Sequence, residues 1–414
     1  MATLFQRRLF LPLETKHICR QLIPNVWARP LATMASPKSY DAVIIGAGPG
    51  GLTAASTLLD EGLSICMIDP YFKAGRIQEK YREVPSNTKV KLFAQWATAT
   101  QAFSKVIEEA PEKNPYAKML TFDQDQGCML GDAINIAQML SDGLRQDERV
   151  DSIEGKATTL RHTEGHWVLP EHHITARKVV FAQGSHPRKP VGALKGMKKM
   201  ANVEYIRLDT CLKPSELRTA VGKGSVVGVV GSSHSAVLAM KNLYEIEGVK
   251  IVNFYRSKLL YAEYKDDWIL YDNTGLKGVA ADWGKDVLEN PPDPEKLRRV
   301  DIRESIKKHY GDEFAAYKEE LAGCTHLIAA IGYRNNRMPD VTGVTGLEGN
   351  PIFDPHTGNF KFAENLGPIP GLHGVGIAYP ETVTDKVGNV ESAVGWFKFM
   401  KFMKRVVPEW TKST

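Results

Sequence analysis

A glycine-rich turn between residues 40 and 69 constrains the fold of this chain more than any other feature. The stretch reads YDAVIIGAGPGGLTAASTLLDEGLSICMID. It predicts a buried strand at 42–45, a helix at 52–59 and a second strand at 64–68. Gly46, Gly48 and Gly51 lie in the turn at the spacing GxGxxG, and the second strand ends in Asp69. This order of elements predicts a Rossmann unit that binds the ADP half of a dinucleotide.

Each of these four residues has an expected task. Gly46 permits the tight turn, Gly48 lets a pyrophosphate approach the backbone, and Gly51 lets the helix pack against the strand. The pyrophosphate then lies at the helix N-terminus, where free N–H groups favour an anion. We expect Asp69 to accept hydrogen bonds from the adenosine ribose. The N-terminal position of the unit favours FAD over a nicotinamide nucleotide.

A second turn of this kind occurs in VVGVVGSSHSAVLAM, residues 226–240. The predicted elements are a strand at 226–230, a helix at 236–243 and a second strand at 250–255. Gly231 opens the turn, and Ser233 stands where a middle glycine is expected, with a hydroxyl that can donate to a phosphate oxygen. Ser235 keeps the start of the helix small. Between the two serines, His234 faces solvent or a phosphate, or else is catalytic.

The second unit ends in Arg256, where the first unit has an acid. A guanidinium favours the 2′-phosphate of NADPH through paired hydrogen bonds, whereas a carboxylate favours a bare ribose. Arg256 is therefore assigned to NADPH, and the alternative is a solvated residue at the end of a strand.

Two dinucleotide units in one chain indicate an electron relay in which NADPH reduces FAD. Two stretches, KVVFAQGS and HLIAAIGY, each read as a strand followed by a glycine, Gly184 in the first and Gly332 in the second. They are interpreted as the points where the chain leaves and re-enters the first unit. The expected fold is α/β, with two Rossmann-like three-layer domains, the nucleotide domain being inserted into a discontinuous FAD domain. The expected bounds are 34–190 and 323–414 for the FAD domain, 191–322 for the NADPH domain, and 257–320 for an aromatic and acidic insertion within it. That insertion forms a lid or substrate pocket, or packs between the domains.

These motifs resemble the two-dinucleotide-binding flavoproteins over residues 40–400. FAQGSHPRKP and AAIGY are similar to the linkers of NADPH-using flavin monooxygenases, although Gln183 and Ile331 replace the usual threonines. The stretch YREVPSNTK is similar to a segment that, in that family, implies a place for Asn87 near the flavin ring; the alternative is an ordinary Asx turn. The resemblance also implies that Gly376 lies in the strand closing the FAD site. It further implies that Asn389 belongs to the start of a helix whose N-terminus points at the flavin.

Two absences narrow the chemistry. Residues 192–208 lack the Phe and His of the FxGxxxHxxxY/W segment, which argues against a Baeyer–Villiger monooxygenase. The disulfide reductases of the superfamily need a redox cysteine pair, and no CxxC or CxxxxC occurs here. The cysteines are Cys19, Cys66, Cys128, Cys211 and Cys324, without the spacing of a zinc site, so no metal is expected.

The first 33 residues differ in composition from the rest. They carry five basic residues against Glu14, so they hold most of the net charge of +5 and leave a nearly neutral body. This composition predicts a mitochondrial transit peptide and a matrix location. Initiation at Met34 would instead give a cytoplasmic form. The neutral body argues against nucleic acid as a partner, and no apolar run is long enough for a transmembrane helix.

The first hypothesis is an FAD- and NADPH-dependent, monooxygenase-like enzyme that oxygenates a nitrogen, sulfur or carbon atom of a small molecule. The alternatives are an NAD(P)H:acceptor reductase that serves a quinone or small redox protein, and a non-catalytic nucleotide-binding sensor. A homodimer is compatible with the sequence.

Overall fold

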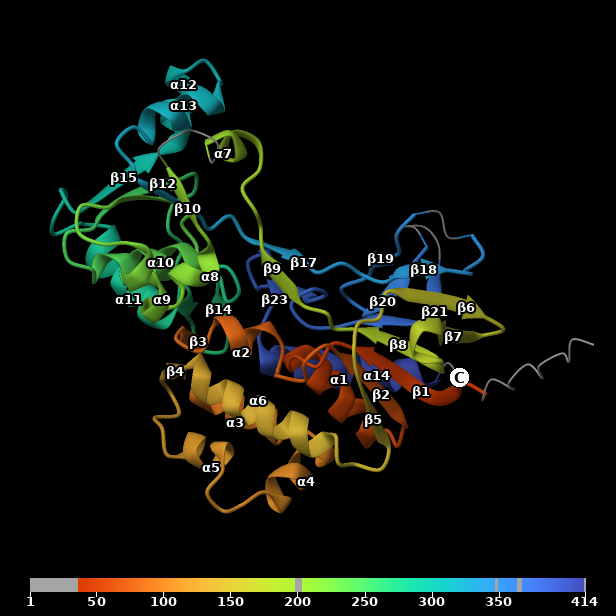
Figure 1. Cartoon of the computed structure of the whole chain (residues 1–414). Coiled ribbons are helices and arrows are strands. Elements are labelled where there is room, and N and C mark those ends of the chain that lie inside the picture. The colour runs from red at the N-terminus through yellow and green to blue at the C-terminus, as the bar shows by residue number, and fades with distance from the viewer. Residues whose placement is uncertain (1–35, 198–202, 347–348, 363–366, 413–414) are drawn as a thin grey trace, which may run out of the picture. The chain divides into compact units, whose positions relative to one another are not determined.

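Two sheets carry the fold (Figure 1). The first has a parallel centre with antiparallel strands added to it, and the second is parallel throughout. The computed structural model describes residues 36–197, 203–346, 349–362 and 367–412. The predicted transit peptide therefore lies outside the described residues. From Pro37 onward the chain forms one compact unit.

The first sheet has a parallel centre in the order β5-β2-β1-β8. Its bounds are β1 Lys38–Ile45, β2 Ile65–Asp69, β5 Val150–Glu154 and β8 Ile174–Phe181. The end of β8 pairs in parallel with β21 Pro368–Gly374, and its beginning pairs antiparallel with β7 His166–Leu169. The sheet continues through β6 Thr159–Thr163, β18 Asp340–Thr342, β19 Ile352–Phe353 and β20 Asn359–Lys361.

Helices cover one face of the first sheet. They are α1 Pro49–Asp60, α3 Val90–Ala97, α4 Gln101–Glu109, α5 Pro115–Leu120, α6 Leu130–Leu144 and α14 Trp396–Lys412, and the short α2 Arg76–Lys80 lies near α6 (Figure 1). Trp396 makes edge-to-face contacts with Phe93 and Trp96, which fixes α14 against α3. A second apolar cluster lies on the other face, and Phe360 of β20 is one of its buried members.

The second sheet is parallel throughout, in the order β10-β16-β11-β12-β15. Its bounds are β10 Glu204–Ile206, β11 Val226–Val230, β12 Lys250–Tyr255, β15 Leu297–Asp301 and β16 His326–Ala329. Its helices are α7 Gly192–Met197, α8 Leu208–Cys211, α9 Pro214–Ala220, α10 His234–Tyr244, α11 Gly278–Trp283, the π-helix Gly284–Leu288, α12 Ile302–Lys308 and α13 Glu313–Glu320. Separate apolar clusters lie on its two faces, as in a three-layer Rossmann fold. The predicted α/β class with two Rossmann-like units is thus confirmed.

Short antiparallel pairs complete the described chain. They are β3 Pro85–Lys89 with β4 Gly127–Met129, β9 Ser185–Pro187 with β17 Tyr333–Asn335, β13 Glu263–Tyr264 with β14 Ile269–Leu270, and β22 Glu381–Thr384 with β23 Val390–Ala393. A 3₁₀ turn spans Pro170–His172.

Three predicted boundaries are wrong. β16 pairs with β10 and β11, so the chain returns to the first sheet after Ala329 and not at residue 323. β15 is a strand of the second sheet, so the insertion that starts at 257 ends before Leu297 and not at residue 320. The helix expected to begin at 388–391 begins at Trp396, because residues 390–393 are used as strand β23.

Candidate functional site

Gly46 and Gly51 are required by the folding of the first turn itself. Gly46 has φ +109°, and a Cβ there would lie 2.4 Å from the carbonyl oxygen of Ala182. A Cβ on Gly51 would lie 1.8 Å from the carbonyl oxygen of Gly46. Any side chain at either position would push the turn away from β8 or α1 away from the turn.

Gly48 has no such constraint from the protein. Its φ is −76°, and a Cβ there would meet nothing closer than the Cα of Gly75 at 3.7 Å. It lies at the N-cap of α1, which has no side-chain cap and no acidic residue in its first turn. The space above Gly48 and the unsatisfied N–H groups fit the pyrophosphate of FAD.

The Asp69 carboxylate is buried and already organises the loop beside this turn. It accepts hydrogen bonds from the backbone N–H groups of Ala47 at 2.8 Å and of Tyr71 and Phe72 at 2.9 Å each. A carboxylate has about four acceptor positions, so about one is left for a ribose hydroxyl. All three hydrogen bonds come from backbone N–H groups of the protein, and the predicted contact of Asp69 with a ribose stays a prediction.

The loop held by Asp69 brings a further glycine to the site. Phe72, Ala74 and Gly75 have φ values of +48°, +46° and +73°, a run of left-handed backbone that the surroundings of the loop must enforce. A Cβ on Gly75 would lie 3.0 Å from the Cα of Gly48. Sequence analysis missed this loop, because two of its three left-handed residues are not glycine.

Gly376, but not Asn389, is placed at the first turn. A Cβ on Gly50 would lie 2.9 Å from the Cα of Gly376, so the segment after β21 crosses the start of α1. Asn389 lies in the turn of the β22–β23 hairpin, where its amide donates to Asp385 at 2.7 Å. Asn389 therefore does not begin a helix, and α14 starts after Gly395 instead.

Gly184 and Gly332 belong to the two linkers. Both have left-handed φ, +72° and +89°, beside the paired strands β9 and β17. Gln183, before the first of these glycines, donates from Nε2 to the Tyr379 hydroxyl at 2.6 Å. The linkers are thus joined to the segment that follows Gly376.

The second glycine turn repeats the arrangement. Gly231 has φ +132°, and a Cβ there would lie 2.5 Å from the carbonyl oxygen of Ala330. Ser233 is the N-cap of α10 and is exposed, and its side chain does not cap the helix. Within the described chain, the hydroxyls of Ser233 and Ser235 have no hydrogen-bond partner in the protein. The uncapped helix start and these hydroxyls fit the pyrophosphate of NADPH.

Arg256 follows β12 and forms an ion pair with Glu313, the first residue of α13. Its side chain is 56% exposed, so a phosphate can reach it. Next to it, the guanidinium of Arg299 lies over the ring of Tyr255 at 4.4 Å. A phosphate can therefore reach the Arg256 guanidinium, but it would have to compete with the Glu313 carboxylate.

His234 and Asn87 meet where the two sheets approach each other. The His234 Nε2 atom accepts a hydrogen bond from the Lys277 backbone N–H at 3.1 Å and lies 3.4 Å from the Asn87 Nδ2 atom. Burial lowers the pKa of His234 to about 4. The Nε2 side of this imidazole therefore contacts the protein, and the expectation that the partly exposed ring faces solvent or a phosphate stays a prediction. Asn87 lies in β3 and not in an isolated Asx turn.

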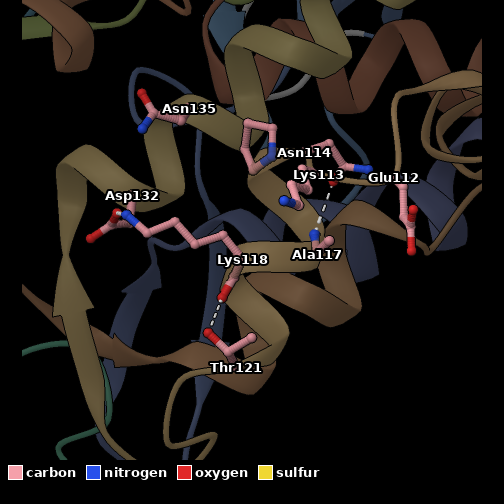
Figure 2. Close-up of a pocket in the computed structure, with 9 residues that line it drawn as sticks. Glu112, Lys113, Asn114, Ala117, Lys118, Thr121, Asp132 and Asn135 are labelled. Atoms are coloured by element: carbon pink, nitrogen blue, oxygen red, sulfur yellow. Dashed lines mark hydrogen bonds and ion pairs between the residues drawn. The ribbon is translucent and has the colours of Figure 1, made fainter.

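The polar pocket of Figure 2 lies apart from both glycine turns. It has a volume of about 510 Å³ between the segment before α5 and the start of α6. Its side chains are largely used by local structure: Lys118 pairs with Asp132 at 2.8 Å, and Asn114 caps α5. No residue predicted for a cofactor lines it. The lining residues are Glu112, Lys113, Asn114, Pro115, Ala117, Lys118, Thr121, Asp132 and Asn135.

The cysteines that the structure describes are all free and are poor nucleophiles. Burial raises the pKa of Cys66 to about 12 and the pKa values of Cys128 and Cys324 to about 11, and it also raises that of Cys211. Thiols with such pKa values are not suited to disulfide exchange. The same part of the chain contains no cluster of side chains suited to a metal ion. It also contains no helix that is long and apolar enough to cross a membrane.

Two Rossmann sheets, each with an anion-binding glycine turn, define a flavoprotein with two dinucleotide sites. A model of the pyridine nucleotide-disulphide oxidoreductase family matches residues 40–337. The chain belongs to this family. It is therefore a flavin-dependent oxidoreductase of the pyridine-nucleotide type, although its sequence has no closely spaced pair of cysteines for disulfide chemistry.

Several individual proteins are similar to this chain. Monooxygenase AgnR1 of Paecilomyces divaricatus is 41% identical over 402 residues, which are 91% of this chain and 99% of the relative. A soluble pyridine nucleotide transhydrogenase of Colwellia psychrerythraea is 28% identical over 36% of this chain and 32% of its own length. Among solved structures, the flavin-containing monooxygenase of Stenotrophomonas maltophilia covers 91% of this chain and 99% of its own, with 14% identity and a TM-score of 0.50. A double variant of that enzyme gives a TM-score of 0.51.

Proposed function

We propose that this protein is an NADPH-dependent flavin monooxygenase that transfers one oxygen atom of O₂ to a nitrogen, sulfur or carbon atom of a small molecule. The observation that carries the proposal is its 41% identity to a monooxygenase along 99% of that relative's length. The free thiols of the described chain, with their raised pKa values, support it because they do not suit disulfide chemistry. For each turnover, NADPH, a proton, O₂ and the substrate give NADP⁺, water and the oxygenated product.

The side chains of this protein bind and orient the coenzymes. When bound, FAD accepts a hydride from NADPH and in its reduced form reacts with O₂. The start of α1 and the space above Gly48 hold the FAD pyrophosphate, with Gly376 beside them. The start of α10, with Ser233 and Ser235, holds the pyrophosphate of NADPH, and Arg256 binds its 2′-phosphate.

Isotope labelling tests the proposed reaction. Purified holoprotein is supplied with NADPH, ¹⁸O₂ and three probes: methyl phenyl sulfide, N,N-dimethylaniline and phenol. We expect one ¹⁸O atom in an oxygenated product of at least one probe and less hydrogen peroxide than NADPH consumed. A reductase would instead form one hydrogen peroxide from O₂ for each NADPH oxidised in air and leave every probe unlabelled. It would also oxidise NADPH faster when a quinone is added. That second pattern would overturn the proposal.

We further propose that residues 1–33 direct the protein to the mitochondrial matrix. The support is their composition: Arg7, Arg8, Lys16, Arg20 and Arg29 stand against one acid. Import of the full chain into isolated mitochondria, followed by N-terminal sequencing, tests this location. We expect a shortened product inside the organelle, whereas a chain that starts at Met34 should stay outside. Equal exclusion of both chains would contradict the proposal.

A further inference from the structure

His234 lies at the start of the nucleotide-binding helix, but the Nε2 atom of its side chain is used by contacts within the protein. It is the first residue of α10, directly after the N-cap Ser233. Its imidazole is directed at residues outside this helix: the backbone of Lys277, which precedes α11, and the side chain of Asn87 in β3. Ser233 and Ser235 flank it with unpartnered hydroxyls in the described chain. The serine hydroxyls of this turn are thus available to a ligand, whereas the Nε2 atom of His234 is bonded within the protein.

The hydrogen bonds specify the state of this imidazole. A backbone N–H can only donate, so Nε2 must be the unprotonated acceptor and the proton must sit on Nδ1. The low pKa, about 4, keeps the ring neutral, since burial and the nearby Lys277 charge disfavour a second proton. The one lone pair of Nε2 accepts from Lys277, so the Asn87 amide, 3.4 Å away, can only share it as the longer arm of a bifurcated contact.

The contacts of Lys277 extend this connection to the helix α14. The Lys277 ammonium pairs with Asp272, and the other oxygen of Asp272 pairs with the ammonium of Lys398 at 2.6 Å. Lys398 is the third residue of α14, which packs on the first sheet. Nearby, Gly278 approaches the carbonyl oxygen of Ser86 in β3, with its Cβ position 3.6 Å away. The start of α10 is therefore held on the first-sheet side at β3 and, through two ion pairs, at α14.

We infer that His234 is a positioning residue for hydride transfer: its imidazole fixes the start of the NADPH-binding helix relative to Asn87 and Lys277, and so sets the nicotinamide against the flavin. This inference rests on the proposed use of NADPH and FAD. Transfer of a hydride depends steeply on the separation and angle of the two rings, so the loss of a fixed contact slows transfer more than it weakens binding.

Anaerobic stopped-flow reduction of the bound FAD at several NADPH concentrations separates the two quantities. For His234→Ala we expect a limiting rate constant about 10- to 100-fold lower and a Kd for NADPH within about threefold of the original. His234→Gln retains an acceptor oxygen for the Lys277 N–H, so its rate constant should recover to within about threefold. Asn242→Ala is the matched control, because it removes one hydrogen bond of the same helix, to the Cys211 carbonyl at 2.9 Å, away from β3.

Three outcomes would overturn the inference. They are an unchanged rate constant in His234→Ala, a loss confined to the Kd, or an equal loss in Asn242→Ala. If the unmodified protein is not reduced by NADPH at all, the proposed function fails instead. The geometry then still has its own test: ¹⁵N NMR of histidine-labelled holoprotein should show a His234 imidazole that keeps its proton on Nδ1 and titrates below pH 5 (ordinary value 6.5). A titration near the ordinary value would contradict the inference.

Discussion

Gly48 and Gly51 lie in the same turn, but different neighbours require them to be glycine. A methyl group on Gly51 would collide with the Gly46 carbonyl oxygen, whereas one on Gly48 would meet only ordinary contacts. Gly51 is therefore needed for the fold and Gly48 for a ligand. This distinction could not be read from the GxGxxG spacing, which treats the glycines alike.

Substitution of these two glycines by alanine should separate folding from FAD binding. Gly48→Ala should unfold within a few degrees of the original, yet its Kd for FAD should rise at least about tenfold, which is about 1.4 kcal/mol. Gly51→Ala should yield little soluble protein. Thermal unfolding and quenching of flavin fluorescence on binding measure both properties. A Gly48→Ala protein that retains stoichiometric FAD through purification would contradict the assignment.

Arg256 and Glu313 should have opposite effects on the use of NADPH. Arg256→Ala removes the cation expected to bind the 2′-phosphate and should raise the KM for NADPH about 10-fold or more, with little effect on NADH. Glu313→Gln removes the competing carboxylate seen in the ion pair and should lower the KM for NADPH. Steady-state kinetics with both nucleotides measure these changes. Equal changes for NADPH and NADH would exclude a phosphate contact.

At the scale of elements, α14 and β21 enclose a buried histidine. His373 in β21 stacks on Trp410 of α14 with ring centroids 4.1 Å apart, and its Nδ1 atom lies 2.8 Å from the Asn359 side-chain oxygen. Its Nε2 atom is buried, without a hydrogen-bond partner in the described chain. Burial lowers the pKa of His373 to about 3, so the ring is neutral in the folded protein.

Stability should therefore fall as the pH drops below the ordinary histidine pKa of 6.5. Between that pH and about 3, the unfolded chain binds a proton on this residue and the folded chain does not. The free energy of unfolding then decreases by about 1.4 kcal/mol per pH unit for His373. His234 adds a similar share down to pH about 4. The urea concentration at the midpoint of unfolding should therefore fall from pH 7 to 6 to 5, and it should fall less steeply in His373→Gln. The same dependence on pH in both proteins would contradict the burial of a neutral ring.

The elements that sequence predicted best are those set by local patterns. β11 and β12 have the predicted bounds, because a short apolar run next to a glycine turn is readable within a few residues. The sheet membership of β15 and β16 was missed, because only pairing with distant strands decides it. The family resemblance implied a helix start at Asn389. The β-branched residues Thr382, Val383 and Val390 and the Asp385 turn made a hairpin instead.

At the scale of the molecule, polar contacts join segments packed around the first sheet to segments packed around the second. Arg76, beside Gly75, pairs with Asp209 of α8, and Tyr81 donates to the same carboxylate at 3.0 Å. The buried Glu391 of β23 accepts from the Asn273 backbone N–H at 3.0 Å. The sequence predicted the two coenzymes but not these contacts. Each contact joins charged or polar residues that are more than 100 positions apart, and no local pattern indicates which of them will meet.

Both coenzymes are central to this interpretation, and one experiment tests them together. Purified protein saturated with FAD is mixed with NADPH in the absence of oxygen, and the visible absorption of the flavin is followed. We expect the bound flavin to be bleached by NADPH and, much less efficiently, by NADH, and its colour to return when air is admitted. Protein that remains colourless when offered FAD, or bound FAD that NADPH does not bleach although dithionite does, would contradict the transfer of hydride between two sites on this chain.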